Sequence, residues 1–597
     1  MKDKERHLFY YQRELSFLRE MGAVFAEQHP KIAKRLGLSK GQASDPHVER
    51  LIESFAFLTS YIQKDLDGQF PRLSSSLLDT IMPILTRPIP SMGIAEFALD
   101  TAQKMTSGQI LPAKTPVYTE SADVTQNLRF HTTEPIHFNP IQITSVSITS
   151  LRKYSEFSRY KSGQGLLVTL KSLAGSFAQL AIPSVRFFLN MQRNQSLALY
   201  SYIMRAKEPI AVLQEKIPHI YPGFIPQPVG MKQESLMLPS DTAQIGYALL
   251  QEYFCLPEKF LFVDIPLPKA LDSDEITVMI PLATAESLTE YHFSANSLLL
   301  HCTPIVNLFE KITEPLSFDH KKVEYRLIPD RKRQKSTEIY SIHNLYTARS
   351  MGEKEKVISP YFSYNHEHLT AQNTMFWNAR RVAAGRGYRG TNMYISFVDK
   401  DASPLSHIQE TVYARTLCTN RGLAADIQPG TQFYSDVATP AATIMPVMEM
   451  TEPLYPSLDG INQWKLISML ATSYTEFSTA EEGVDRLKNL LTMLSEKTLA
   501  ENQSEIQSVL RLQVDPCIRR FQRHKEWAGF YNGNHVKLHV DEHTISAEQL
   551  YLLLSILSEF FATQTHMHAF SMLSVSSNVR EGVWHTWQPR AGEAQTL

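Results

Sequence analysis

The sequence predicts an α+β protein with an N-terminal helical bundle, a β-rich middle and a mixed α+β C-terminal part. Apolar residues recur at three- and four-residue steps from Tyr10 to Met92, as in amphipathic helices. Strand-like alternation dominates after that point, and strand and helix patterns are mixed beyond residue 394. We therefore expect a helical domain at 1–92, a β-rich domain at 93–310, a basic polar connecting region at 311–393 and a mixed α+β domain at 394–597.

Bulk composition indicates a folded cytoplasmic protein. At 597 residues the chain is long enough for three or four domains, because single cores rarely grow beyond roughly 250–300 residues. The net charge of −2 gives no reason to expect nucleic acid or an anionic membrane as the main partner. The four scattered cysteines fit a reducing compartment. The mixed-charge N-terminus is not a signal peptide, and the apolar run 550–562 is too short to span a bilayer, so we expect a buried helix there.

The first predicted helix carries two neighbouring apolar stripes. One contains Tyr11, Leu15, Leu18, Gly22 and Phe25, and the other contains Tyr10, Phe17, Met21 and Val24. Two stripes exceed what one packing partner needs, so we expect this helix to pack on two sides, once against its own domain and once against another chain. The alternative is an ordinary helical core. The candidate anchors of a partner interface are Tyr10, Tyr11, Leu15, Leu18 and Phe25.

Two further helices are expected before the chain turns into strands. Asp45 is a predicted N-cap and Pro46 suits the first helical position, where no intrahelical partner for the amide is lost. A third helix should run from Arg72 to Met82 and end before Pro83. The expected buried face of the second helix consists of Val48, Leu51, Ile52, Phe55, Leu58, Ile62 and Leu66.

The middle of the chain contains strand patterns with two informative details. Alternation at Ile141 and Ile143 slips by one residue before Val146 and Ile148, which predicts a β-bulge. Residues 260–265 are apolar on both faces, as in a central strand. Glu252 stands in an apolar helix; with no partner legible nearby, we expect an exposed or capped charge.

Blocks of sequence along the chain resemble the TssF (VasA/ImpG) family. They occur in the family's order and reach Gly592, so the resemblance covers almost the whole chain. The blocks are Tyr10-Tyr11-Gln12-Arg13-Glu14-Leu15, Asp45-Pro46-His47-Val48-Glu49-Arg50-Leu51, Gly246-Tyr247-Ala248-Leu249-Leu250-Gln251-Glu252-Tyr253-Phe254, His301-Cys302-Thr303-Pro304-Ile305-Val306-Asn307-Leu308-Phe309, Leu417-Cys418-Thr419-Asn420-Arg421 and Trp464-Lys465-Leu466-Ile467-Ser468-Met469-Leu470.

The resemblance implies a structural subunit of the baseplate of the type VI secretion system. Such a subunit nucleates a contractile sheath at the cytoplasmic face of the inner membrane of a Gram-negative bacterium, and meets the membrane complex only indirectly. The implied partners are TssG, with two copies of this chain per TssG, then TssK, TssE and the VgrG spike hub. No nucleic acid, small-molecule substrate or cofactor is implied.

Two other functions are left open by the residues themselves. His535, His539 and His543 are spaced by four, as are metal ligands of a hydrolase on one face of a helix, but their alternation with Val536 and Leu538 indicates a half-exposed strand instead. Arginine, glycine and tyrosine are interleaved over 380–389 and would suit a nucleic-acid-binding module. No phosphate-binding glycine loop, nucleophile elbow or His-Glu-x-x-His motif is present. We therefore assign no catalytic, cofactor-binding or metal residues.

Overall fold

The fold was analysed in a computed structural model. It describes residues 3–592 except 36–44, 101–104, 106, 121–126, 215–216, 241–244, 270, 284–287, 289–291, 319–321, 349–355, 362–374, 386–387, 399–409, 459, 471–479, 496–498 and 525–526. The chain forms two compact units. The helical unit contains Met1–Thr86 and Ser457–Ser468, and the main unit contains Arg87–Pro456 and Met469–Leu597. None of the helices in the described ranges has both the length and the apolar composition needed to cross a membrane.

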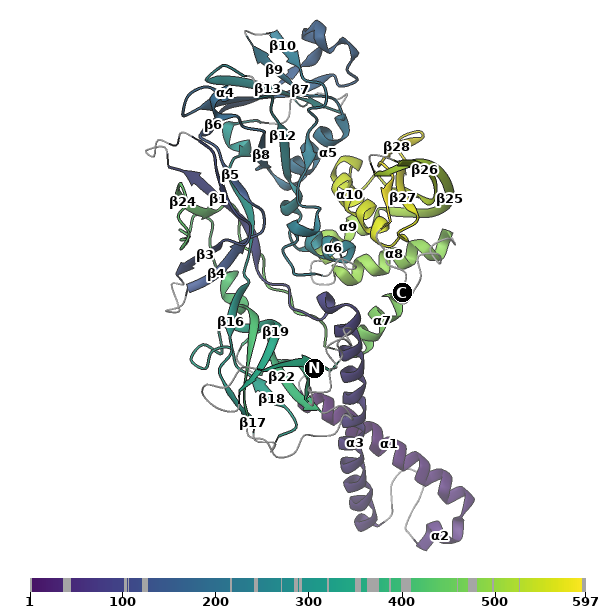
Figure 1. The fold of residues 1–597 in the computed structure, drawn as a ribbon. Coiled ribbons are helices and arrows are strands. Elements are labelled where there is room, and N and C mark those ends of the chain that lie inside the picture. Colours follow the sequence, from purple (N-terminus) through teal and green to yellow (C-terminus); the bar gives the residue numbers. More distant parts are fainter. Residues whose placement is uncertain are drawn as a thin grey trace. The chain divides into compact units, whose positions relative to one another are not determined.

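The helical unit is built on two long helices (Figure 1). Its elements are α1 (Asp3–Gln28), α2 (Pro30–Arg35), α3 (Pro46–Ile81), the short η1 (Pro83–Leu85) and most of α7 (Gly460–Leu470). The predicted N-cap is confirmed, because the Asp45 side chain accepts a hydrogen bond from the His47 amide at 2.9 Å. Arg19 on α1 donates to Glu49 on α3 at 3.0 Å. The prediction of separate second and third helices is wrong: α3 is continuous through Pro71, which removes only one amide donor from a long helix.

The buried side of α3 is not the predicted one. Leu51, Phe55, Leu58 and Ile62 are between 57% and 61% exposed, and the side chain of Leu66 lies outside the described residues. The buried positions are Ala56, Ser60, Ser74 and Leu78. At 3.6 residues per turn these two sets lie roughly 150° apart around the helix. Gln463 of α7 accepts hydrogen bonds from Ser74 Oγ at 2.9 Å and Ser75 Oγ at 2.8 Å. Apart from Leu78, small and polar residues therefore face the unit's interior, and the large apolar residues of the predicted face lie outward.

The first part of the main unit consists of three larger sheets and one small one. Sheet A has the order β24 (Ala441–Pro446), β1 (Met92–Leu99), β15 (Cys302–Val306), β4 (Asn127–Thr132), β3 (Pro116–Glu120). Sheet B has the order β10 (Ile217–Ile220), β9 (Ala211–Gln214), β13 (Glu275–Leu282), β7 (Gln164–Ser172), β6 (Ile141–Ser150). Sheet C has the order β11 (Gln227–Pro228), β12 (Phe262–Pro266), β8 (Ser184–Leu189), β14 (Leu298–Leu299), and β2 (Gln109–Leu111) pairs with β5 (Ile136–Phe138).

Helical segments connect these strands. They are η2 (Leu151–Lys153), η3 (Ser155–Arg159), α4 (Phe177–Leu180), α5 (Arg193–Ala206), η4 (Gln233–Ser235), α6 (Ile245–Cys255), η6 (Pro257–Phe260) and η7 (Ala295–Ser297). Two details predicted from the sequence are confirmed. The register of β6 against β7 shifts between Ile143 and Ser145, at the predicted bulge. Strand β12 pairs on both sides and is central in sheet C.

Residues predicted to form a polar connecting region contribute strands to the largest sheet. Sheet D has the order β16 (Phe309–Ile312), β23 (Glu410–Thr419), β19 (Glu338–Ala348), β20 (Lys356–Pro360), β21 (Phe376–Ala383), β22 (Thr391–Val398), β18 (Tyr325–Leu327), and β17 (Leu316–Phe318) also pairs with β23. Its core includes Leu345, Ile395, Val412 and Ala414. The charged residues of this region hid the strands in the sequence, although the side chains of two of them, Glu338 and Arg381, are only 1% and 9% exposed within the sheet.

The C-terminal part packs sheet E against helices. It contains η9 (Arg421–Ala424), α8 (Ala480–Leu494), α9 (Leu499–Gln507), β25 (Val509–His524), β26 (Trp527–Val540), α10 (Ala547–Thr563), β27 (Phe570–Ser577), β28 (Val583–Thr586) and β29 (Arg590–Ala591). Helix α10 is the predicted buried helix; it connects the parallel strands β26 and β27 and packs on α5 and α6 (Figure 1). A Cβ at Gly246 would lie 2.3 Å from Thr563 Oγ1, so α6 and α10 approach this closely only with glycine there.

Glu252, expected from the sequence to be an exposed or capped charge, is fully buried and has partners within the protein. Its Oε2 forms an ion pair with Lys259 Nζ, and both side chains are completely buried. Its Oε1 accepts from the amides of Met237 at 2.7 Å and Leu238 at 2.8 Å. The pair therefore attaches the loop 222–241 to α6 and η6. Helix periodicity does not predict Lys259 as the partner, because it lies seven positions after Glu252 and beyond the end of α6.

We predict that Lys259→Met lowers the thermal unfolding midpoint of the protein strongly. Removing one member of a buried ion pair leaves the other charge uncompensated, which costs about 3–5 kcal/mol. The double variant Glu252→Gln/Lys259→Met should recover most of the loss, because the Gln carbonyl oxygen still accepts from Met237 and Leu238. Calorimetry of the three proteins checks this. Equal midpoints for the single and double variants would contradict it.

Candidate partner interface

The five candidate anchors on α1 differ in exposure. Tyr10 is buried at 7% exposure, with its ring 5.8 Å from that of Phe9 and beneath the Arg13 guanidinium at 5.4 Å. Tyr11, Leu15 and Leu18 are half-buried, and Phe25 is at the edge of exposure with 36%. The structure thus places most of the first predicted stripe partly inside the helical unit.

Three of the four residues of the second stripe of α1 are exposed, whereas Tyr10 is buried. Phe17, Met21 and Val24 follow each other at four- and three-residue steps and are 55%, 48% and 41% exposed. We call these three residues the α1 stripe. The α3 stripe, defined as Leu51, Phe55, Leu58 and Ile62, has the same spacing and higher exposure.

Such exposure is unusual for a protein that works alone. Large apolar side chains scattered singly over a surface need no explanation, but contiguous apolar stripes mark interaction surfaces. Phe57 and Tyr61 add an exposed aromatic pair to α3, with ring centroids 5.1 Å apart. The helical unit therefore presents apolar surface on both long helices, and the larger part is on α3, which sequence reasoning assigned to the core.

Two blocks that carried the family resemblance meet in the main unit. Asn420 N donates to Asn307 Oδ1 at 2.7 Å, and Asn307 Nδ2 donates to Asn420 Oδ1 at 2.8 Å. The same two side chains bond to the backbone of Arg129 on β4, through its amide and its carbonyl oxygen. Both asparagines are fully buried. This asparagine pair joins sheet A to sheet D and explains the turn predicted around Asn420.

Arg421 extends this buried polar cluster. Its guanidinium donates to the backbone oxygens of Thr337, Arg389 and Thr391 at 3.2, 3.0 and 3.1 Å. Gly390 has a φ of +114°, and a Cβ there would lie 2.3 Å from Arg421 Nη1. All of these contacts are internal to sheet D and its loops, so the cluster holds the fold and offers no reacting group.

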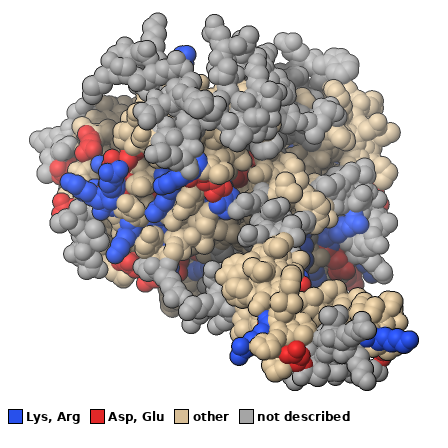
Figure 2. Space-filling view, turned by 90° about the horizontal axis from the view of Figure 1, so that it is seen from below, with Lys and Arg blue, Asp and Glu red and all other residues tan. Residues whose placement is uncertain are grey.

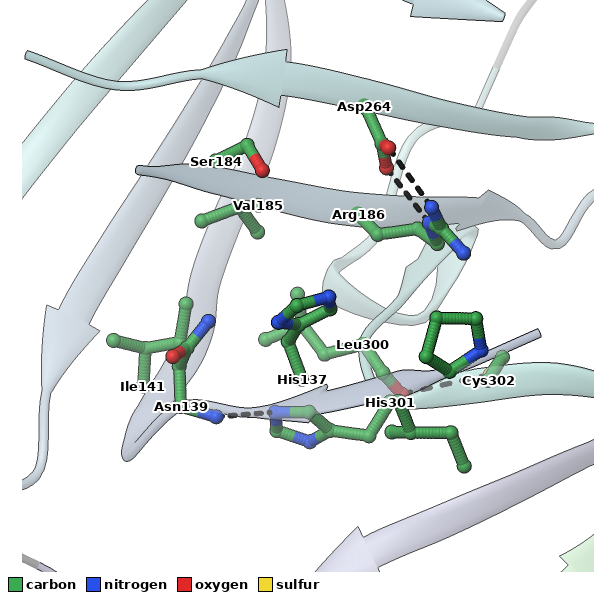
Figure 3. A pocket seen from close by; sticks show the side chains of 12 residues that line it. His137, Asn139, Ile141, Ser184, Val185, Arg186, Asp264, Leu300, His301 and Cys302 are labelled. Atoms are coloured by element: carbon green, nitrogen blue, oxygen red, sulfur yellow. Dashed lines mark hydrogen bonds and ion pairs between the residues drawn. The ribbon is translucent and has the colours of Figure 1, made fainter. Parts of the chain in front are cut away.

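A small cavity is lined by β5, by β8 and β12 of sheet C, and by residues 300–302 at the start of β15 (Figure 3). Its volume of about 40 Å³ suits one or a few water molecules. Arg186 forms a two-bond ion pair with Asp264, at 2.7 and 2.9 Å, and a third contact with Glu134 at 3.2 Å. His301 Nε2 accepts from the Asn139 amide at 3.3 Å, and burial lowers the pKa of His301 to about 4. The charged groups are matched within the protein, which indicates a structural cavity.

The histidines considered as metal ligands lie along a strand and its following turn. His535 and His539 point from β26 toward β27 and bond to Ser574 Oγ at 2.7 Å and Ser576 Oγ at 3.0 Å. His543 lies beyond the strand, and its amide bonds to Asp541. Val536, Leu538 and Val540 on the alternate positions are buried, which confirms the strand prediction. Within the described ranges, no group of three His, Cys, Asp or Glu residues is arranged to hold a metal ion.

Two of the arginines considered for nucleic-acid binding have partners inside the protein, whereas Arg389 is largely exposed and lies 3.5 Å from the similarly exposed Glu452. Arg380 pairs with Glu324 through two bonds at 3.0 and 2.5 Å. Arg381 donates to the carbonyl oxygens of Ile339 and Tyr340 at 2.9 and 2.7 Å. Arg386 of this stretch lies outside the described residues. On the face seen in Figure 2, basic side chains have acidic ones beside them, so the described surface there is not uniformly positive.

The chain was compared with known proteins. It matches the family model described as "Type VI secretion system, TssF" over residues 3–594. It is 26% identical to the type VI secretion system component TssF1 of Pseudomonas aeruginosa strain PAO1, over 99% of this chain and 100% of that protein.

Two solved structures have a similar fold. One is a chain of a type VI secretion system TssK-TssF-TssG baseplate subcomplex, with a TM-score of 0.71 and 21% identity over 91% of this chain and 99% of that chain. The other is a chain of a type VI secretion system baseplate complex, with a TM-score of 0.60 and 21% identity over 99% and 100%. Since the family model spans nearly every residue, the resemblance seen in the sequence blocks is confirmed, and the chain belongs to the TssF family of the type VI secretion system.

Proposed function

We propose that the protein is a structural subunit of a type VI secretion baseplate. In this proposal two copies of the chain join one TssG subunit, and TssK and TssE attach to that wedge around the VgrG spike hub. The subunit acts in the cytoplasm, at the inner membrane, where the assembled baseplate nucleates the contractile sheath. Membership of the TssF family over the whole chain carries the proposal, and the fold shared with chains of two baseplate complexes supports it.

The apolar surface of the helical unit supplies the attachment. Protein interfaces of standard size bury about 800 Å² per partner, and a few aromatic or aliphatic anchors at their centre contribute most of the binding energy. The α1 stripe and the α3 stripe together offer seven large apolar side chains, which is the composition such a centre requires. Of the five anchors chosen from the sequence, Phe25 is the one exposed enough to contribute without rearrangement.

The activity of such a protein is mechanical. Subunits hold one another in a ring, and a signal shifts the balance between two packings so that the sheath is released. Apolar stripes on helices suit this role because helices repack by sliding or rotating against a partner without breaking backbone hydrogen bonds. We propose no catalytic step for this chain.

We predict that Leu58→Asp abolishes co-purification with TssG when the two proteins are co-expressed. A carboxylate at the centre of an apolar interface loses its hydration without gaining a partner. Because Leu58 is exposed in the isolated chain, the thermal midpoint should stay close to that of the parent, as exposed substitutions usually change stability by about 0.5 kcal/mol or less.

The matched control is Arg50→Asp. It introduces the same carboxylate on an exposed position of the same helix, outside the α3 stripe, and should retain TssG. Retention of TssG by Leu58→Asp at the parent yield would reject the α3 stripe as the interface. A large drop in its melting midpoint would instead make Leu58 a core residue.

A second pair of variants separates the exposed α1 stripe from the buried anchor Tyr10. We expect Phe17→Asp to lose TssG with unchanged melting, because Phe17 is exposed. Tyr10→Ala should mainly destabilise the helical unit, since removing a buried aromatic side chain costs about 3–5 kcal/mol. Limited proteolysis of the helical unit and TssG pull-down measure the two effects. If Tyr10→Ala loses TssG while α1 stays protected, the interface includes the candidate anchor Tyr10.

A further inference from the structure

A large basic cleft in the main unit has no role in the function proposed above. Its volume is about 690 Å³, and it is lined by η2, the start of β7, the last turn of α5, the first turn of α10 and the segment before β28. Four cationic side chains but one carboxylate line it, namely Arg152, Lys161, Arg205, Arg580 and Glu548. Two further carboxylates contact the lining from beside it: Glu208 accepts from the amides of Lys161 and Ser162, and Glu542 pairs with Arg580, so the cleft with these neighbours keeps an excess of one positive charge.

The carboxylate does not balance the cations around it. Glu548 Oε1 accepts from Arg580 Nη2 at 2.9 Å and, at the longer distance of 3.5 Å, from Arg205 Nη1. Arg580 has a second partner in Glu542 at 3.1 Å. The Arg205 guanidinium instead stacks over the Trp584 ring, 4.4 Å from its centroid. This stacking does not use the five N–H donors, so most of them remain available to a ligand. Burial lowers the pKa of Arg205; Glu548 opposes this shift and Arg580 adds to it.

The outer part of the cleft has groups ready for a ligand. Arg152 and Lys161 are exposed, and in the described part of the chain neither side chain has an ion-pair partner. Gln164 also lines the cleft, and its side-chain oxygen Oε1 accepts no hydrogen bond within the protein. The side chain can therefore rotate toward a ligand without losing a hydrogen bond at Oε1. A ligand with both negative charges and N–H donors would satisfy all of these groups.

We propose that this cleft binds an acidic peptide segment of another protein, with carboxylates at Arg152, Lys161 and Arg205 and a main-chain N–H at Gln164. Arg205 and Arg580 meet at Glu548, whereas Arg152 and Lys161 come from other elements and do not contact that carboxylate, so an extended segment with several carboxylates matches more of the cations than a single phosphate does. The volume lies within the range of about 300–1,000 Å³ typical of ligand pockets, enough for several residues of extended chain. The site is chemically distinct from the α1 and α3 stripes and does not depend on TssG binding.

Fluorescence anisotropy of the full-length protein tests this proposal. The probe is a fluorescein-labelled hexapeptide of alternating Glu and Gly, and the matched probe has Gln in place of Glu. We expect the Glu peptide to bind with a Kd at least about tenfold lower than that of the Gln peptide. Added salt should weaken this binding, because the cations are partly exposed to solvent.

Variants locate the binding. The double variant Arg152→Glu/Lys161→Glu should raise the Kd of the Glu peptide by at least about tenfold, whereas Lys171→Glu should not. Lys171 is an exposed lysine on the same strand as Gln164 but outside the cleft. Both proteins should still co-purify with TssG, which separates this test from that of the α3 stripe.

Several results would overturn the proposal. They are absence of binding by the Glu peptide, equal binding of the Gln peptide, an unchanged Kd in the double variant, and an equal loss in Lys171→Glu. Complete displacement of the peptide by an equimolar amount of inorganic phosphate would also overturn it, because the cleft would then be a site for small anions.

Discussion

The small side chains on one side of α3 determine which face of this helix is buried in the helical unit and which face is exposed. Helices approach each other at a distance set by the residues at their contact, and Ala56, Ser60 and Ser74 permit a close approach. Ser74 and Ser75 then reach Gln463 on α7. Once this side faces inward, the geometry of a 3.6-residue helix turns the α3 stripe outward. The exposed apolar surface is thus a consequence of which face can pack most closely.

The main unit is held together differently, by buried polar contacts between elements far apart in sequence. The Glu252–Lys259 pair attaches a long loop to a helix, and the Asn307–Asn420 pair connects two sheets. Apolar contacts tolerate small displacements, whereas a buried hydrogen bond is lost when its partners shift and leaves a costly unpaired group. These contacts therefore fix the positions of sheets and loops within the main unit.

The sequence predicted local structure well, but it did not predict which face of an element would be buried. The bulge at Ile143, the cap at Asp45 and the buried helix α10 follow from short-range patterns, and all three are present. The stripe on α3 was also detected, yet periodicity reports only that apolar residues share a side. A core face and a binding face have the same spacing. The deciding signal was the row of Ala and Ser residues on the opposite side.

Other features were outside the reach of sequence patterns because they depend on tertiary contacts. The partner of Glu252 lies after the helix ends, and the basic cleft combines residues from positions 152 to 580. The strands β19 to β22 carry charges that resemble those of a solvated linker, although alternate positions such as Ile395 and Phe397 are buried. In each case the sequence shows the residue type, but it does not predict which residues lie next to it in the folded protein.

The apolar stripes and the basic cleft would respond to different conditions, which has a consequence for assembly. Burial of apolar surface is little affected by moderate salt, whereas contacts between partly exposed charges weaken as salt screens them. A partner held by the stripes of the helical unit would remain attached under conditions that release a peptide from the cleft. One subunit could then keep a permanent partner while it exchanges a second one. In the proposed baseplate subunit, an apolar surface and a charged surface would let one partner stay bound while another dissociates. A single uniform surface would release both partners under the same conditions.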